Sequence, residues 1–119
     1  MKYVMLFGSP SDDTWAQLPA GTAERIYEEI MTWWGQHAAA GEIIGGERLQ
    51  AGSTATTIRL GSSSKPELAD GPFIESKEEV SGFGLLEVAD LDAAIALAKT
   101  WPALQVPGES VEVRPVFAM

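Results

Sequence analysis

The sequence contains no cysteine, and His37 is the only histidine among its 119 residues. The absence of cysteine excludes disulfide bonds, thiolate catalysis and thiolate-bound metals. A single histidine also argues against a conventional zinc site. The sequence lacks a phosphate-binding glycine loop and a serine nucleophile elbow as well. We therefore expect no metal centre and no cofactor.

Basic residues and long apolar runs are also scarce. Eight basic residues against 17 acidic ones give a formal net charge of −9, which repels phosphate backbones and anionic membrane surfaces. No stretch approaches the length that spans a membrane, and the apolar run at residues 1–7 is too short for a secretion signal. We expect a soluble cytoplasmic protein that binds neither nucleic acid nor membrane.

The chain has the length of one compact domain, and no linker, repeat or low-complexity tract divides it. We therefore predict a single domain over residues 1–119. Alternating or continuous apolar runs predict strands, and an apolar stripe at helical spacing predicts a helix. The predicted strands are residues 2–8, 42–50, 54–60, 82–88 and 111–117, and the predicted helices are residues 22–40 and 90–99.

Several glycine, proline and aspartate residues mark where these elements end or bend. Gly41 is placed to end the first helix in a left-handed conformation, and Asp90 is placed to cap the second. The pair Gly45-Gly46 predicts a bulge or a close approach of another group to the backbone. Pro115 cannot donate to a strand ladder, so the last strand is expected at an edge of the sheet.

The connections complete the predicted fold. Residues 51–53 predict a turn that joins the second and third strands into an antiparallel hairpin. Residues 9–21 and 61–79 are expected to be loops, with Trp15 folding back onto the body of the protein. This order is typical of an α+β ferredoxin-like sandwich, in which two helices cover one face of an antiparallel sheet. The other face would be apolar and uncovered, so we predict a homodimer in which two sheets pack face to face.

The stretch between the third and fourth predicted strands holds the strongest turn signal. Asp70-Gly71-Pro72 forces a sharp bend, because Gly71 tolerates positive φ and Pro72 restricts the residue before it. Phe73 would anchor this loop, leaving the carboxylates of Asp70 and Glu75 on a stiff backbone that suits chemistry. The alternative is that Asp70 only caps a turn and the following acidic residues are a solvated charge run.

This stretch also carries a family resemblance. The motif that resembles the YCII-related family, in its DGPF branch, is Asp70-Gly71-Pro72-Phe73 followed by Glu75, Lys77, Glu78 and Gly82-Phe83. The resemblance extends to residues 45–49, 55–59, 89–94 and 111–115, and so covers nearly the whole chain. It implies the dimeric α/β barrel fold, whose clefts suit a small aromatic or lactone-like ligand. The DGPF branch is associated with genes for extracytoplasmic-function sigma factors, so the resemblance also implies a functional link to a sigma factor.

His37 lies on the apolar side of the first predicted helix, beside Trp33 and Trp34. One interpretation is a core histidine whose ring nitrogen bonds a strand carbonyl. The other is a general base that lines a pocket, with the two tryptophans sandwiching a flat substrate. The tryptophans themselves, with Trp101, are expected to belong to the core rather than to a cofactor site.

Charged residues supply the remaining candidates. Acid–base chemistry would fall to Asp70, helped by Glu75 or Glu47. Arg59 and Arg114 could anchor an anionic group, or could form salt bridges with Glu112 or Glu87. The predicted catalytic residues are Asp70, Glu75 and His37, and the predicted ligand-binding residues are Gly46, Glu47, Arg59, Gly71, Phe73 and Arg114.

Two hypotheses about function follow. The first is a dimeric small-molecule-binding or regulatory module. The alternative is a cofactor-independent isomerase, lyase or dehydrochlorinase, in which Asp70 acts as general acid or base on a small ring substrate.

Overall fold

The computed structural model describes residues 1–10, 12–71 and 79–118 of the chain. The elements in these ranges are six strands, three α-helices and two short 3₁₀ turns. The strands are β1 (Lys2–Ser9), β2 (Ile43–Arg48), β3 (Thr56–Leu60), β4 (Pro66–Asp70), β5 (Glu79–Glu87) and β6 (Ser110–Pro115). The helices are α1 (Asp12–Ala16), α2 (Thr22–Ala39) and α3 (Leu91–Ala98), and the 3₁₀ turns are η1 (Gly52–Thr54) and η2 (Pro102–Gln105).

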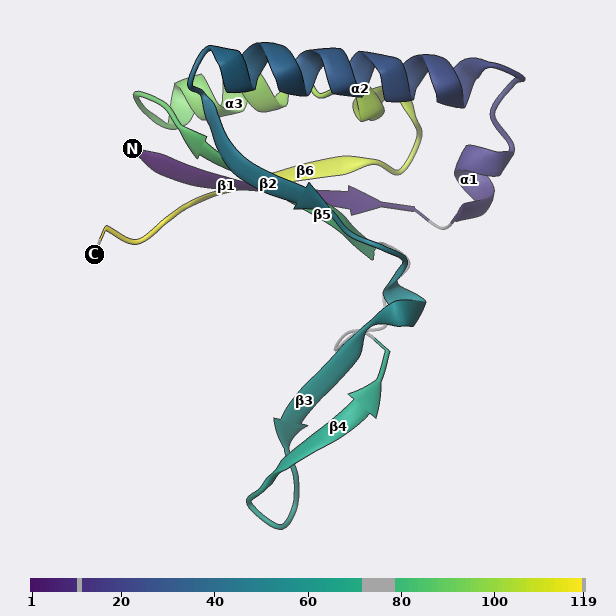
Figure 1. Cartoon of the computed structure of the whole chain (residues 1–119), viewed down its shortest axis with the longest axis vertical. Coiled ribbons are helices and arrows are strands. Elements are labelled where there is room, and N and C mark those ends of the chain that lie inside the picture. Colours follow the sequence, from purple (N-terminus) through teal and green to yellow (C-terminus); the bar gives the residue numbers. More distant parts are fainter. Residues whose placement is uncertain (11, 72–78, 119) are drawn as a thin grey trace.

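Four of these strands form one antiparallel sheet in the order β2-β5-β1-β6. Helices α2 and α3 lie side by side over one face of this sheet (Figure 1). The predicted α+β class, with helices on one face of an antiparallel sheet, is confirmed. Strand β6 lies at the edge of the sheet, as Pro115 predicts.

The core fills the space between the helices and the sheet. Side chains alternate along β1, so Tyr3, Met5 and Phe7 are buried beneath the helices. Trp101 stacks on Phe7 with 4.1 Å between ring centroids, and the edge of Trp33 meets Trp101 at 5.1 Å. The prediction that these tryptophans belong to the core is confirmed.

The predicted hairpin between residues 42–50 and 54–60 is wrong. Strand β2 pairs with β5, and β3 pairs with β4, a strand inside the region 61–79 that was expected to be a loop. The backbone N–H of Leu49 donates to the carbonyl of Ser81 at 2.8 Å, which carries the β2–β5 pairing to the end of β2. The turn at η1 then leads the chain out of this sheet. The sequence indicated the turn correctly but not the strand partners, because a glycine-containing turn sets a change of direction and does not choose which strands pair.

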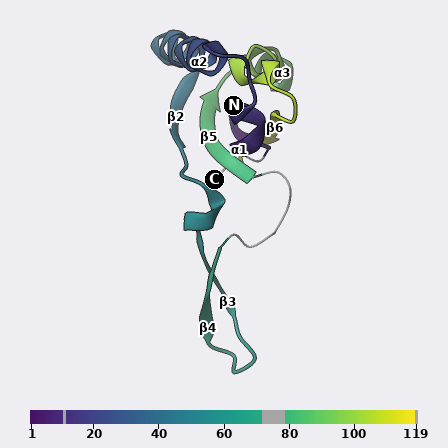
Figure 2. The ribbon, with the colours of Figure 1, turned by 90° about the vertical axis from the view of Figure 1, so that its right-hand side faces the viewer.

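Strands β3 and β4 form a two-stranded hairpin, residues 56–70, which we call the arm. The arm projects from the sheet on the side opposite the helices (Figures 1 and 2). It raises the radius of gyration to 16.4 Å, whereas a compact domain of this length would have about 13.5 Å. All five residues of β4 are exposed.

The glycine signals have clear structural causes. Gly41 adopts φ +79° directly after α2, as the sequence predicts. The β2–β5 register shifts between Ile43 and Gly45, and Gly46 has φ +143°. A Cβ at Gly46 would lie 2.4 Å from the carbonyl oxygen of Phe83 and 2.6 Å from the Trp34 ring. Both predictions for this pair, a bulge and a close approach, are therefore confirmed.

The region 9–21 was expected to be a loop, but it contains the short helix α1. Trp15 on this helix stacks on Tyr27 of α2, with 5.2 Å between the ring centroids. Its indole N–H donates to Glu109 at 2.8 Å. The predicted folding of Trp15 onto the body is confirmed.

Candidate functional site

One candidate surface is the sheet face that the helices do not cover, which we call the open sheet face. Its apolar centre consists of four half-buried side chains on the two central strands, Val4, Leu6, Phe83 and Leu85. Val4 lies opposite Leu85, and Leu6 lies opposite Phe83, so the four side chains form one contiguous patch. An apolar patch of this kind is typical of a surface that contacts another molecule.

Charged side chains flank this patch on both edge strands. Glu112 and Arg114 of β6 lie opposite Leu6 and Val4, and Glu47 of β2 lies opposite Phe83. The Arg114 guanidinium pairs with the Glu112 carboxylate, and both side chains are exposed. This ion pair runs along one strand, and its partner is one of the two that the sequence suggested for Arg114.

Asp70 and Gly71 lie at the base of the arm, where β4 ends. The Gly71 N–H donates to the carbonyl of Ala55 at 2.7 Å, and the Thr57 hydroxyl donates to the Gly71 carbonyl at 2.7 Å. Asp70 is exposed, and its carboxylate has no hydrogen-bond or ion-pair partner among the described residues. The bend is therefore held by Thr57 and backbone bonds rather than by the Asp70 side chain.

The other predicted residues near this bend are only partly described. Phe73 and Glu75 lie outside the described residues. Arg59 lies on β3 of the arm, opposite Glu67 of β4. Gly46 lies against Trp34 and β5, so the group that approaches its backbone comes from the same chain.

His37 lies near the end of α2 and is 24% exposed. Its Nδ1 is 2.8 Å from Oε1 of Glu42, and its ring meets Trp33 at 4.8 Å between centroids. The partner of this imidazole is therefore a carboxylate and not the strand carbonyl of the first interpretation. A carboxylate fixes the orientation of an imidazole, which is what acid–base chemistry requires.

A single copy of the chain does not bring the predicted catalytic and anchoring groups together. Helix α2, which carries His37, lies at the opposite end of the molecule from the arm, which carries Asp70 and Arg59 (Figures 1 and 2). Arg114 lies on the outer strand β6. Within one copy, His37, Asp70 and Arg59 therefore do not form a single site.

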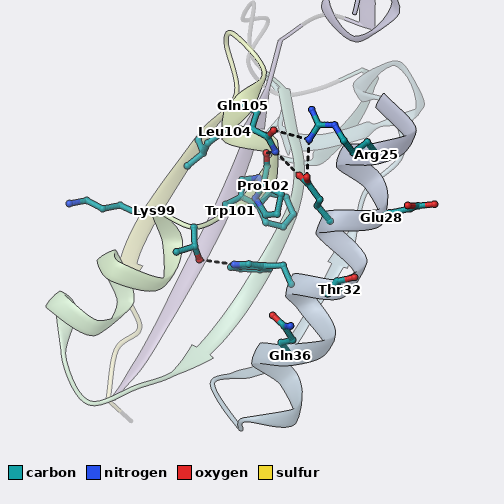
Figure 3. A pocket seen from close by; sticks show the side chains of 12 residues that line it. Arg25, Glu28, Thr32, Gln36, Lys99, Trp101, Pro102, Leu104 and Gln105 are labelled. Atoms are coloured by element: carbon teal, nitrogen blue, oxygen red, sulfur yellow. Dashed lines mark hydrogen bonds and ion pairs between the residues drawn. The ribbon is translucent and has the colours of Figure 1, made fainter. Parts of the chain in front are cut away.

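A groove of about 700 Å³ runs between α2 and the segment that leads into η2 (Figure 3). Trp33 and Trp101 line it, and the Trp33 indole N–H donates to the Thr100 hydroxyl at 2.7 Å. The buried Nε1 of Trp101 has no hydrogen-bond partner among the described residues. The sequence does not reveal this groove, because its two walls are far apart in the chain. Trp33 and Thr100, which are hydrogen-bonded to each other, are separated by 67 residues.

One end of the groove is closed by a polar network (Figure 3). Arg25 donates to Glu29 at 2.8 Å and to the Gln105 side-chain oxygen at 3.1 Å. The Gln105 amide donates to the other Glu29 oxygen at 2.7 Å. The Gln105 hydrogen bond, with the charge of Arg25, holds the pKa of Glu29 below its ordinary value.

A second polar cluster, also missed from the sequence, joins β1, β5 and the start of β6. Glu109 accepts from the Trp15 indole at 2.8 Å and from the Ser9 hydroxyl at 3.0 Å. The Ser9 and Ser81 hydroxyl oxygens are 2.7 Å apart. Ser9 has one hydroxyl proton, so Ser81 donates to Ser9 when Ser9 donates to Glu109. This cluster fastens α1 to the end of the sheet.

The described side chains and helices also bear on metal and membrane binding. Within residues 1–10, 12–71 and 79–118, no three histidine, aspartate or glutamate residues are grouped as a metal ion would need. None of the helices in these ranges has the length and apolar character to cross a membrane.

The antiparallel sheet, its two covering helices and its open face define a small α+β domain of the ferredoxin-like kind. The chain belongs to the YCII-related domain family, which matches it over residues 1–119. The family resemblance read from the sequence is thus confirmed.

Similarity to individual proteins supports the same fold and family. An uncharacterised protein of Rhizobium meliloti (strain 1021) is 32% identical over 93 residues, which is 78% of this chain and 74% of that protein. A solved structure of 5-chloro-2-hydroxyhydroquinone dehydrochlorinase from Burkholderia phenoliruptrix AC1100 superposes with a TM-score of 0.57. It covers 98% of this chain and 94% of the other at 12% identity, and it was determined in complex with 2,5-dihydroxybenzoquinone. At this identity the similarity establishes a shared fold.

Proposed function

We propose that the chain is a homodimeric small-molecule-binding or regulatory module whose two copies meet through their open sheet faces. The observation that carries this proposal is the contiguous apolar patch of Val4, Leu6, Phe83 and Leu85. An apolar sheet face has to be covered to avoid aggregation, and a second identical face is complementary to it by symmetry. A ligand would then lie between the two sheets, enclosed by the charged residues of the edge strands.

The dimer is tested by placing a charge at the centre of the patch. We expect the wild-type chain to sediment at twice its mass of 12.7 kDa, and the Leu6→Glu variant to sediment as a monomer. Met31→Glu is the matched control, because Met31 is 75% exposed on α2, away from the open sheet face. Far-ultraviolet circular dichroism checks that both variants are folded. A wild-type protein that stays at 12.7 kDa at every concentration would contradict the proposal.

The ligand is expected to be a small ring compound carrying hydroxyl or carboxylate groups. The structurally similar dehydrochlorinase holds 2,5-dihydroxybenzoquinone, so this compound and small aromatic acids or lactones form the first panel of probes. A probe at about 100 times its dissociation constant should stabilise the folded protein by about 2.7 kcal/mol, measurable as a rise in melting temperature. If no member of the panel shifts the melting temperature, the ligand part of the proposal fails.

A second candidate function is a cofactor-independent enzyme that moves a proton on such a ring. The observation that favours it is the His37 imidazole held at 2.8 Å by the Glu42 carboxylate. In this candidate Asp70 is the general acid or base, with Arg59 or Arg114 holding an anionic group of the substrate. The imidazole, Asp70 and the arginine would have to be contributed jointly by the two copies of a dimer.

The two candidates are separated by Asp70→Asn. General acid–base groups contribute about 10²- to 10⁴-fold to rate, so the variant should lose at least about 100-fold in turnover if Asp70 is catalytic. Chloride release from 5-chloro-2-hydroxyhydroquinone, the substrate named for the similar enzyme, is the first assay. A binding module would show no turnover and would keep its ligand affinity in this variant.

The regulatory form of the proposal names a sigma factor as the functional partner and the cytoplasm as the site of action. The support is the resemblance of residues 70–73 and their surroundings to the DGPF branch of the family. Cross-linking in cells followed by mass spectrometry, together with cell fractionation, tests both statements. Recovery of the chain outside the cytoplasm, or without any sigma factor, would contradict them.

A further inference from the structure

The arm carries an apolar surface that its own chain leaves uncovered. Ile58 lies opposite Leu68, and Leu60 lies opposite Pro66, so these side chains share one face of the hairpin. Ile58, Leu60 and Leu68 are 65%, 71% and 74% exposed. Large aliphatic side chains grouped in this way, at one end of an acidic protein, indicate a contact surface.

The arm also has little structural support from the described part of the chain. Among the described strands, β3 and β4 pair only with each other. At its base, the Gly52 N–H donates to the Glu79 carboxylate of β5 at 3.1 Å. A two-stranded hairpin on its own is marginally stable in water, because it has no third strand or helix to bury its apolar face. The arm therefore needs a covering surface supplied from outside the chain.

We propose that the arm of each copy docks on the body of a second copy, with Ile58, Leu60 and Leu68 as its contact residues. This inference rests on the proposed homodimer and adds to it the part of the chain that clasps the partner. The arm projects on the same side as the open sheet face (Figures 1 and 2). A copy that covers the open sheet face therefore lies beside the arm.

Charge and length both favour a second copy as the occupant. The arm carries two basic and two acidic residues, so the whole net charge of −9 belongs to the rest of the chain. A neutral arm that docks on an acidic body adds no charge repulsion to the contact between the two copies. Each five-residue strand spans about 17 Å, and the shortest dimension of the molecule is 19 Å, so the arm can extend over most of the width of a partner.

The exchange of arms makes the candidate site composite. Asp70 lies at the base of the arm on the face that carries Leu68, so it would enter the interface with the partner, whereas Arg59 lies on the other face of the arm. A two-fold axis then repeats the same contact twice, and every donated arm has a receiving body. The site that one copy leaves incomplete would thus be completed by residues of the other.

The first test compares two substitutions on opposite faces of β4. Leu68→Asp places a charge on the apolar face, and Ala69→Asp places the same charge on the other face, one residue along the strand. Because each arm buries one such leucine in the dimer, Leu68→Asp should raise the dissociation constant of the dimer by about 10-fold or more. Ala69→Asp should leave it within about 3-fold of the wild-type value, measured by sedimentation equilibrium. Equal constants for the two variants would overturn the proposal.

The second test needs no destabilising substitution and uses the absence of cysteine from the chain. A nitroxide is attached to Ser63→Cys, at the tip of the arm, in copies that contain no ¹⁵N. These copies are mixed with wild-type copies that contain ¹⁵N and no nitroxide. Any broadening of the ¹⁵N-detected signals is then intermolecular, and we expect it at amides in the body of the ¹⁵N-containing copy. Broadening that is absent, or confined to the labelled arm, would overturn the proposal.

These outcomes separate the arm from the dimer itself. A wild-type dimer that shows equal constants in the first test, or no body broadening in the second, refutes the docked arm and leaves the face-to-face dimer standing. A wild-type protein that is monomeric at every concentration refutes the proposed homodimer and the arm together.

Discussion

Replacing Gly46 by alanine should destabilise the protein strongly, because β2 passes β5 too closely to admit a side chain there. A Cβ at this position would lie 2.4 Å from the Phe83 carbonyl oxygen, a backbone atom of the central strand β5. It would also lie 2.6 Å from the Trp34 ring, which packs against the core. Neither neighbour can move away without disturbing the sheet or α2.

The size of the effect follows from two contributions. Forcing extra atoms into a packed region costs about 1–3 kcal/mol. Gly46 also has φ +143°, and a side chain held in such a conformation costs about 1–3 kcal/mol more. Together the two predict a loss of about 2–6 kcal/mol, a large share of the roughly 5–15 kcal/mol that stabilises a domain.

The adjacent residue, Gly45, provides the matched control. A Cβ there would have its nearest contact at 4.0 Å, with Cβ of Leu85, and Gly45 is not among the glycines with positive φ. Gly45→Ala should therefore change the free energy of unfolding by less than about 1 kcal/mol. Urea unfolding followed by tryptophan fluorescence, at one fixed protein concentration, measures both variants. If the free energies of unfolding of Gly46→Ala and Gly45→Ala differ by less than about 0.5 kcal/mol, the close approach of β5 and Trp34 does not restrict the residue at position 46.

Two further predictions concern the helices. Asp90 caps α3 by accepting a hydrogen bond from the Ala93 N–H at 2.9 Å, so Asp90→Ala should lower the free energy of unfolding by about 1 kcal/mol; an unchanged urea midpoint would contradict this. The Gln105 hydrogen bond, helped by Arg25, lowers the pKa of Glu29 below 4.5, and desolvation opposes this with a smaller effect. The ionised Glu29 carboxylate therefore stabilises the folded protein above pH 4.5, and this stabilisation is lost as the pH falls through the lower folded pKa. A ¹³C NMR titration of Glu29 should therefore have its midpoint below 4.5, and Gln105→Ala should raise that midpoint.

The candidate site was predicted in part, because some of its signals are local. The bend at Gly71 is visible in the sequence, since positive φ at this residue needs glycine, and the structure has it at +94°. The candidate residues themselves were chosen by type, and residue type does not fix distance. His37 finds its carboxylate partner five residues further on, whereas its placement relative to Asp70 depends on where the arm goes.

The missed features arise from contacts between distant segments. The Ser9, Ser81 and Glu109 side chains meet only because β1, β5 and the start of β6 are neighbours in the sheet. In the sequence, a serine or a glutamate at a strand end has no distinguishing pattern. The groove beside Trp33 and Trp101 is likewise a product of how α2 packs on η2.

Elements whose causes lie within a few residues follow from the sequence alone. The apolar run at residues 2–8 specified β1, Gly41 ended α2, and Asp90 began α3. The pairing of β2 with β5, and the departure of β3 from the sheet to form the arm, depend instead on contacts between distant segments. Strand partners are chosen by long-range hydrogen bonding and by burial of whole faces, and residues 42–60 satisfy the local rules in either pairing.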